Sequence, residues 1–242
     1  MKQQTNSRNN VPVEDGTKDM ISNEYTLSQS FCDSIKEELI DIVGELSEVG
    51  LDTITEDEGL KSIPFISTAI SLYKIGTTIR EKHHLKKLVA FIMEINKNID
   101  NDKREKYIKK FNENKKFRKK ELEYIIIILD RYLNHDKSKW LAKLYIAYLS
   151  NNLTWIEFLQ YSEIINNFLP GDEIFLKYDR VPKDSRYSYN VYVERFCAMG
   201  LLEKYYINEP VPNISGAPIP VKIQKGVKYS LLGKILCNII FE

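Results

Sequence analysis

The sequence predicts a mainly α-helical protein, with a multi-helix N-terminal region and a small α+β module at the C-terminal end. Apolar residues recur every three or four positions through most of residues 25–168, which is the spacing of amphipathic helices. Glycine and proline number only 10 and 8 among 242 residues, too few for a turn-rich β fold. After residue 200 the pattern changes to short apolar runs, prolines and a hairpin signal.

Three parts follow from these patterns: an arm at 1–24, a helical domain at 25–134 and a C-terminal domain at 135–242. The arm is polar and aperiodic, which predicts disorder. Its start, MKQQTNSRNN, lacks the apolar core of a secretory signal. The three cysteines are far apart in the sequence and form no CxxC pair. We therefore expect a cytoplasmic protein, or one that is peripheral at the membrane.

The first predicted helix begins near Thr26 and ends near Gly50, with Leu27, Phe31 and Ile35 on its apolar side. The next apolar segment, residues 63–76, is too short to span a membrane, which takes about 20 residues. Two interpretations stay open, a buried helix and an interfacial membrane segment followed by cations that attract anionic lipid. The residues that the second interpretation would use are Ile66, Ile70, Tyr73, Arg80, Lys86 and Lys87.

Helical spacing continues through residues 77–95 and stops at a polar break, residues 98–102. The basic segment 103–120 predicts a short helix and a loop. Residues 121–130 contain five consecutive large aliphatics, which suit a strand, but their flanks continue a helical pattern, so we predict a buried helix. Two further helices are predicted at 136–150 and 154–168, the second opened by a capping box of Thr154 and Glu157.

The C-terminal part begins with an irregular segment at 169–186. A helix then follows at 189–199, closed by Gly200, and a strand at 201–206. Four prolines predict a loop over residues 208–220. Residues 224–226 predict the turn of a hairpin between two short strands, and a last helix is expected at 230–237.

Two stretches of this C-terminal part, Met199-Gly200-Leu201-Leu202 and Tyr229-Ser230-Leu231-Leu232-Gly233-Lys234, resemble the winged-helix pattern. The resemblance covers about the last 100 residues and implies a winged-helix-like module. Such modules often place the helix before the wing in the DNA major groove. The basic segment and this helix supply the candidate nucleic-acid contacts Lys115, Lys116, Arg118, Lys119, Lys120, Arg186, Asn190 and Arg195. The alternative is a module used for packing or protein contacts.

A second resemblance covers about residues 48–240. It rests on the Leu60-Lys61-Ser62-Ile63-Pro64 start, on Ala142-Lys143-Leu144 and on Trp155-Ile156-Glu157-Phe158. These stretches are similar to a loosely described group of bacterial helical proteins, some of which sit among phage-defence or abortive-infection genes. The resemblance implies a bacterial cytosolic protein with a role in defence.

The sequence offers no recognisable catalytic or metal-binding motif. There are only three histidines. His83 and His84 would point about 100° apart on a helix, so they are poorly placed to bind one metal ion together. No HExxH, GxSxG or phosphate-binding GxxxxGK[ST] is present. We therefore predict no enzymatic activity, no metal, no cofactor and no small-molecule substrate.

Charge is unevenly distributed although the net charge is only +1. Residues 1–60 carry a net charge of −10 and residues 80–120 carry +9. Three hypotheses fit this pattern. The first and preferred one is a non-enzymatic interaction protein with a protein partner, in phage defence. The second is a DNA-binding regulator, and the third is an effector that acts on an anionic membrane surface through residues 60–87.

Overall fold

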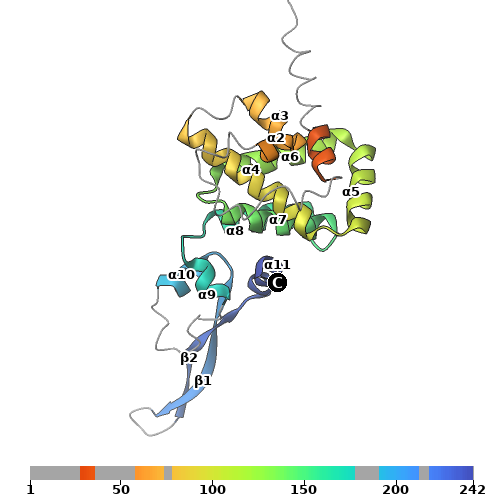
Figure 1. The fold of residues 1–242 in the computed structure, drawn as a ribbon. Coiled ribbons are helices and arrows are strands. Elements are labelled where there is room, and N and C mark those ends of the chain that lie inside the picture. Colours follow the sequence, from red (N-terminus) through yellow and green to blue (C-terminus); the bar gives the residue numbers. More distant parts are fainter. Residues whose placement is uncertain (1–27, 36–57, 74–77, 178–190, 213–217, 242) are drawn as a thin grey trace, which may run out of the picture.

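The computed structural model describes residues 28–35, 58–73, 78–177, 191–212 and 218–241. It is mainly helical with a two-stranded antiparallel sheet near the C-terminal end, which confirms the coarse fold class (Figure 1). The predicted arm, most of the first predicted helix and residues 178–186 lie outside the described residues. Residues 28–35 are helical. The helices that follow in the upper part of Figure 1 are α2 (Glu58–Ser62), α3 (Pro64–Tyr73), α4 (Ile79–Asn98), α5 (Asn101–Glu113), α6 (Lys115–Arg131), α7 (Asp136–Leu149) and α8 (Trp155–Asn166).

The core of this helical body lies between α4 and α7. Tyr145 of α7 is fully buried there, and its hydroxyl is 2.8 Å from that of Tyr107 on α5. Aromatic rings from four other segments surround it, namely those of Phe31, Phe91, Tyr107 and Phe158. Aromatic side chains therefore join the residue 28–35 helix, α4, α5, α7 and α8 into one core.

Local signals set the beginnings of several helices. The predicted capping box at the start of α8 is confirmed, and Thr78 with Glu81 forms a second one at the start of α4. The basic segment predicted as a short helix and a loop is instead almost wholly helical. Only Asn114 interrupts it, and the side chain of Asn114 caps α6 by accepting the N–H of Phe117.

Residues 121–130 are helical, as predicted, but only one side of them is buried. Ile125 and Leu129 are buried, whereas the Ile127 side chain is 57% exposed. In α3, Phe65, Ile66 and Ala69 are fully buried. No helix among the described residues has both the length and the apolar content that crossing a membrane would require.

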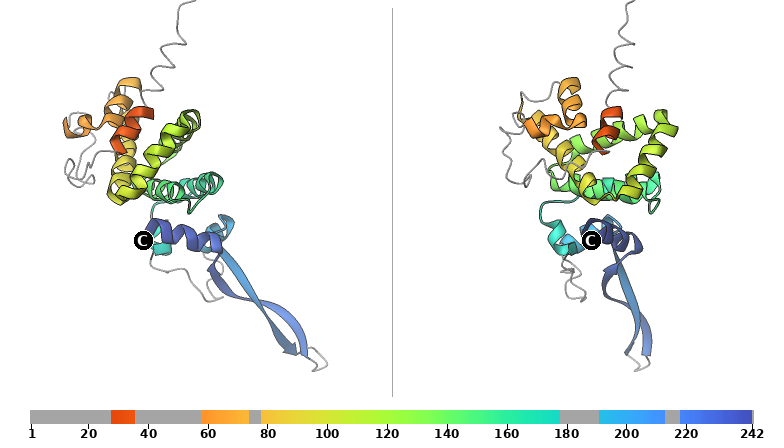
Figure 2. Two further views of the ribbon diagram at one scale, coloured as in Figure 1. Left: turned by 90° about the vertical axis from the view of Figure 1, so that its right-hand side faces the viewer. Right: turned by 45° about the vertical axis from the view of Figure 1, so that its right-hand side comes forward.

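The C-terminal module lies below the helical body in Figure 1. It consists of α9 (Asp172–Lys177), α10 (Val191–Ala198), β1 (Leu202–Pro212), β2 (Pro218–Tyr229) and α11 (Leu231–Phe241). Figure 2 shows the hairpin of β1 and β2 projecting away from all helices. At about 3.3 Å per residue, eleven residues of β1 extend about 35 Å.

The hairpin corrects two sequence predictions. The predicted loop over 208–220 is wrong at both of its ends, because Asn208–Pro212 and Pro218–Pro220 belong to the strands, whereas residues 213–217 lie outside the described residues. Pro210 pairs with Pro220 and Pro212 with Pro218, positions that a two-stranded sheet tolerates because both strands are edges. The predicted turn at 224–226 is also wrong, since these residues lie within β2 beside a bulge opposite Tyr205 and Tyr206.

Gly233 anchors α11 against the end of α10. A Cβ atom at Gly233 would overlap with the carbonyl oxygen of Leu201, the residue before β1, so only glycine fits. The Ser230 hydroxyl donates to the carbonyl of Gly200 at 2.5 Å and accepts the N–H of Gly233 at 2.9 Å. The other side of α11 packs on α7, where the Phe241 and Trp140 rings meet edge to face.

Candidate functional site

Two features stand out as candidate sites, the projecting hairpin and a pocket between α4 and α6. The base of the hairpin is held firmly in the module. Leu202 and Val227 are buried there, and the Tyr229 hydroxyl donates to the carbonyl of Leu176 in α9. Farther out, Tyr206 is 46% and Val221 41% exposed, whereas Tyr205 and Ile207 are half-buried. No third strand pairs with the hairpin among the described residues.

The helix before the hairpin, α10, offers little free positive charge. Arg195 forms an ion pair with the fully buried Asp172 of α9 and lies over the Tyr192 ring. The pKa of Asp172 is raised overall because its carboxyl group is buried; the N–H of Leu169 and the charge of Arg195 offset only part of this effect. Glu194 is bonded to Lys204 of β1 at 2.6 Å. These contacts fix α10 to its neighbours.

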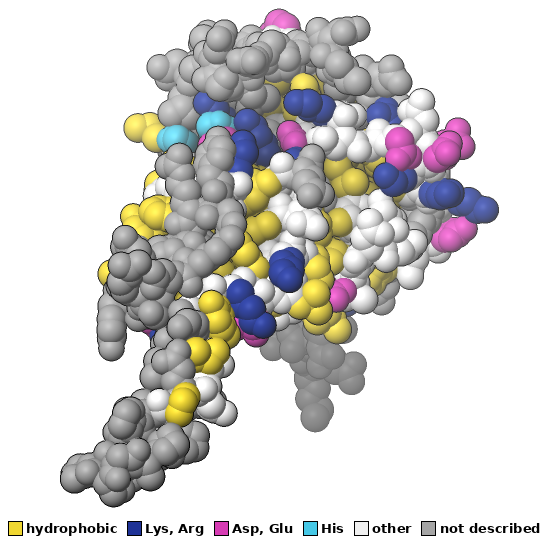
Figure 3. Space-filling view, turned by 90° about the horizontal axis from the view of Figure 1, so that it is seen from below, with side chains coloured by type: hydrophobic (Ala, Val, Ile, Leu, Met, Phe, Trp, Pro, Cys, Tyr) yellow, Lys and Arg dark blue, Asp and Glu magenta, His cyan; other side chains and the backbone are white. Residues whose placement is uncertain are grey.

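The remaining candidate nucleic-acid residues do not form one described surface. Arg118 is buried and bonded to Glu121 and Tyr148. Lys119 is half-buried, 3.9 Å from Glu123, whereas Lys120 is exposed. Arg186 and Asn190, and the side chains of Lys115 and Lys116, lie outside the described residues. On the face shown in Figure 3, Lys and Arg side chains are scattered among acidic and apolar ones.

The candidate membrane residues are also dispersed. Ile66 is fully buried, Ile70 packs against the core, and the Tyr73 side chain lies outside the description. Lys87 is buried, and its ammonium donates to the carbonyls of Asp130 and Tyr132 at 2.8 and 3.0 Å. Arg80 is at the rim of the pocket and Lys86 is half-buried.

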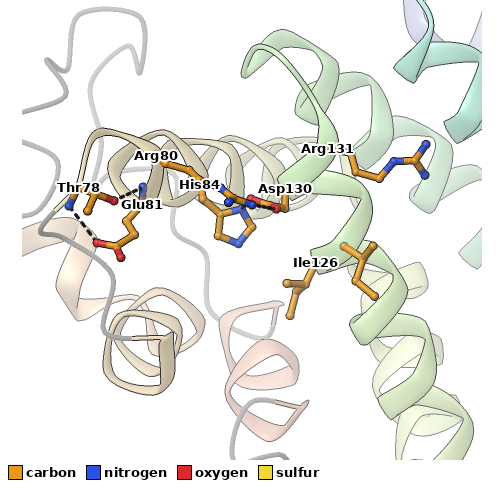
Figure 4. Close-up of a pocket in the computed structure, with 8 residues that line it drawn as sticks. Thr78, Arg80, Glu81, His84, Ile126, Asp130 and Arg131 are labelled. Carbon is orange, nitrogen blue, oxygen red and sulfur yellow. Dashed lines mark hydrogen bonds and ion pairs between the residues drawn. The ribbon is translucent and has the colours of Figure 1, made fainter.

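The pocket forms where the first turns of α4 meet the last turns of α6 (Figure 4), and its volume is about 450 Å³. Its lining residues are Thr78, Arg80, Glu81, His84, Ile126, Ile127, Asp130 and Arg131. Arg80 donates to Asp130 Oδ2 at 2.7 Å, and Arg131 is bonded to Glu163 of α8. The charged side chains on its rim are therefore paired.

His84 is the polar group at the centre of this pocket. Its Nδ1 atom is buried, has no hydrogen-bond partner and lies 3.7 Å from Asp130 Oδ1. Burial lowers the pKa of His84 below 6.5 and Lys87 lowers it further, whereas Asp130 raises it. Burial raises the pKa of Asp130, but the Arg80 hydrogen bond and nearby positive charges outweigh this and lower it overall. At pH 7 the imidazole is therefore neutral and the carboxylate ionised.

Among the described residues, no three His, Cys, Asp or Glu side chains lie together as a metal site requires. Comparisons with protein-family models, with curated proteins and with solved structures give no match for this chain. The hairpin and the pocket are therefore the features that indicate a function for this chain.

Sequence reasoning selected Arg80 by its charge but missed His84, Asp130, Tyr206 and Val221. The contact between Arg80 and Asp130 joins residues 50 positions apart, so no local pattern signals it. For the hairpin, the alternation of apolar residues with prolines was a usable signal, but four prolines outweighed it in favour of a loop.

Proposed function

We propose that this chain is a non-enzymatic interaction protein that contacts a protein partner through its C-terminal hairpin. The observation that carries the proposal is the hairpin itself, two strands of eleven and twelve residues that project from the helices with exposed apolar side chains. An isolated two-stranded hairpin is marginally stable in water. A partner that covers it would bury this apolar surface.

The partner binds a face of the hairpin rather than extending its sheet. Prolines stand in both strands of the outer half, where Pro210 pairs with Pro220 and Pro212 with Pro218. Proline has no N–H group, so a third strand would lack donors at these positions. Tyr205 and Ile207 stand two residues apart in β1, and Val221 pairs with Glu209 two residues farther on, so these positions share one face. An apolar groove on a protein is complementary to this face.

The order α10, β1, β2 and α11 suits a winged-helix-like module with a long wing, and we propose that assignment. We favour a protein over DNA as its partner because residues 210–221 at the hairpin end contain no charged residue. DNA binding needs several cations near phosphates. Arg118 and Arg195 are already paired with Glu121 and Asp172. The same segment has no aromatic residue either, which disfavours a membrane interface.

The test places a photo-crosslinker at the hairpin by the substitution Val221→p-benzoylphenylalanine. The same substitution at the exposed Glu113 of α5 is the control. In cells that express the full chain, Val221 should give one discrete protein adduct that Glu113 does not give. Adducts to nucleic acid or lipid, or equal adducts at both positions, would reject the proposal.

Phage defence is our proposal for the setting of this contact, and it rests on the sequence resemblance alone. Its test is plaque formation on bacteria that carry the chain. Plaques should be reduced with the full chain and restored when residues 207–223 are replaced by a short Asn-Gly turn. Equal plaque numbers with and without the full chain would argue against a defence role.

A further inference from the structure

The pocket between α4 and α6 contains a hydrogen-bonding group that nothing in the fold uses. In Figure 4 one edge of the His84 ring faces Asp130 and the other faces the space beside Ile126. The carboxylate of Asp130, 3.7 Å from Nδ1, favours the tautomer that carries its proton on Nδ1. The Nε2 atom is then a hydrogen-bond acceptor that faces the pocket.

The lining charges disfavour an ionic ligand. Arg80 is paired with Asp130, and Arg131 with Glu163, so neither sign of charge is in excess. The start of α4 does not favour an anion, because the Glu81 carboxylate of the capping box already lies there and accepts the N–H of Thr78. A neutral ligand avoids displacing any of these pairs.

The shape and the remaining contacts favour an aromatic body. Ile126 and Ile127 supply an apolar wall, and Ile127 is 57% exposed. Arg80 uses one nitrogen for Asp130 while its side chain is 83% exposed, which leaves its guanidinium plane open for stacking on a ring. A volume of about 450 Å³ lies within the range of small-molecule pockets.

We propose that this pocket binds a neutral aromatic molecule that donates one N–H or O–H hydrogen bond to Nε2 of His84. The site is separate from the hairpin, so the proposal stands or fails independently of the hairpin function.

The experiment titrates the full chain with indole and, in parallel, with N-methylindole, which has a similar shape but no N–H. The readout is the ring nitrogen shift of His84 in histidine-labelled protein, where only His83, His84 and His135 contribute signals. Indole should bind saturably, with a dissociation constant on the order of 1 mM for so small a ligand. N-methylindole should bind about fivefold more weakly, as expected for the loss of one hydrogen bond.

Isothermal titration calorimetry compares the variants, because His84→Phe lacks the His84 ring signal. The variant His84→Phe should weaken indole binding about fivefold, whereas the neighbouring variant His83→Phe should leave it unchanged. Binding of indole should also fade as the pH falls through the pKa of His84, which burial lowers, because the protonated Nε2 atom no longer accepts a hydrogen bond. Thermal unfolding shows whether each variant is folded, and His84→Leu, which also lacks an acceptor, replaces His84→Phe if that variant is not.

Four outcomes would overturn the proposal. Equal affinities for indole and N-methylindole would show that Nε2 accepts no hydrogen bond. Tighter binding of the anion indole-3-acetate than of indole would show that the pocket selects charge. Shifts at His84 that do not saturate would show that indole does not occupy this pocket, and indole binding as tight in His84→Phe as in the unaltered chain would show that His84 does not contribute to it.

Discussion

Buried or half-buried lysines close the ends of three of the described helices. The Lys87 ammonium donates to the carbonyls at the end of α6. Lys137 donates to the carbonyl of Asn166, the last residue of α8, and to that of Phe168 just beyond it. Lys143 donates to the carbonyl of Ile240 in α11. Helix ends leave carbonyl groups without partners, and a buried one is costly unless it is bonded. Each lysine belongs to a helix other than the one it closes, so these hydrogen bonds also fix how the helices pack against each other.

Lys87→Met should therefore destabilise the fold. The substitution keeps the length of the side chain but leaves the carbonyls of Asp130 and Tyr132 without their donor, at a cost of about 1–3 kcal/mol. Urea unfolding measures the change, with Lys97→Met, an exposed position on the same helix, as control. Equal unfolding midpoints for the two variants would show that these bonds add no net stability.

The ion pair of Arg118 and Glu121 is almost wholly inaccessible, at 3% and 1% exposure. Tyr148 joins the pair through its hydroxyl, and burial together with Glu121 raises the pKa of Tyr148 to about 12. Glu121→Gln should cost about 3–5 kcal/mol, since it leaves the Arg118 charge buried without a counter-charge. The double variant Arg118→Met with Glu121→Gln should recover much of that loss. A double-mutant cycle by chemical unfolding measures the coupling, and strictly additive losses would contradict it.

At the scale of elements, the sequence predicted the features that depend on residues close together in the chain, namely helix caps and amphipathic helices. The α8 capping box spans four residues and was correctly predicted, as were most helices with an apolar stripe. The length of the hairpin was not, because strand pairing depends on the register between distant residues such as Leu202 and Tyr229. The pocket was missed for the same reason. His84 and Asp130 are remote in the sequence and meet only when α4 packs on α6.

Gly233→Ala tests how α11 is attached to α10 and the hairpin. An added Cβ would meet backbone atoms of Leu201, which cannot rotate away, so α11 must shift. We expect a loss of about 1–3 kcal/mol, typical of overpacking. Lys234→Ala, at an exposed position one residue later, should be neutral or slightly stabilising. Thermal unfolding compares the two, and a Gly233→Ala protein as stable as Lys234→Ala would refute the close approach.

At the scale of the whole molecule, the C-terminal module contacts the helical body mainly through α11 on α7. The bond from Lys143 to the Ile240 carbonyl at 3.1 Å and the ring contact of Trp140 with Phe241 belong to this interface. The body has its own core around Tyr145. The boundaries that the sequence predicted, 25–134 and 135–242, remain predictions. Helices α7 and α8 lie after residue 134, yet they pack in the same core as α4.

Phe241→Ala should therefore loosen the module without unfolding the body. The ring is partly buried against Trp140, and its loss should make opening of α10 and α11 about tenfold more frequent, which corresponds to about 1.4 kcal/mol. Amide hydrogen exchange measures this segment by segment, with Asn238→Ala at an exposed position of α11 as control. Faster exchange confined to α9–α11 and the hairpin is the expected result. Equally faster exchange in α4 and α7 would mean that body and module open as one unit, so that a partner on the hairpin would stabilise the whole chain.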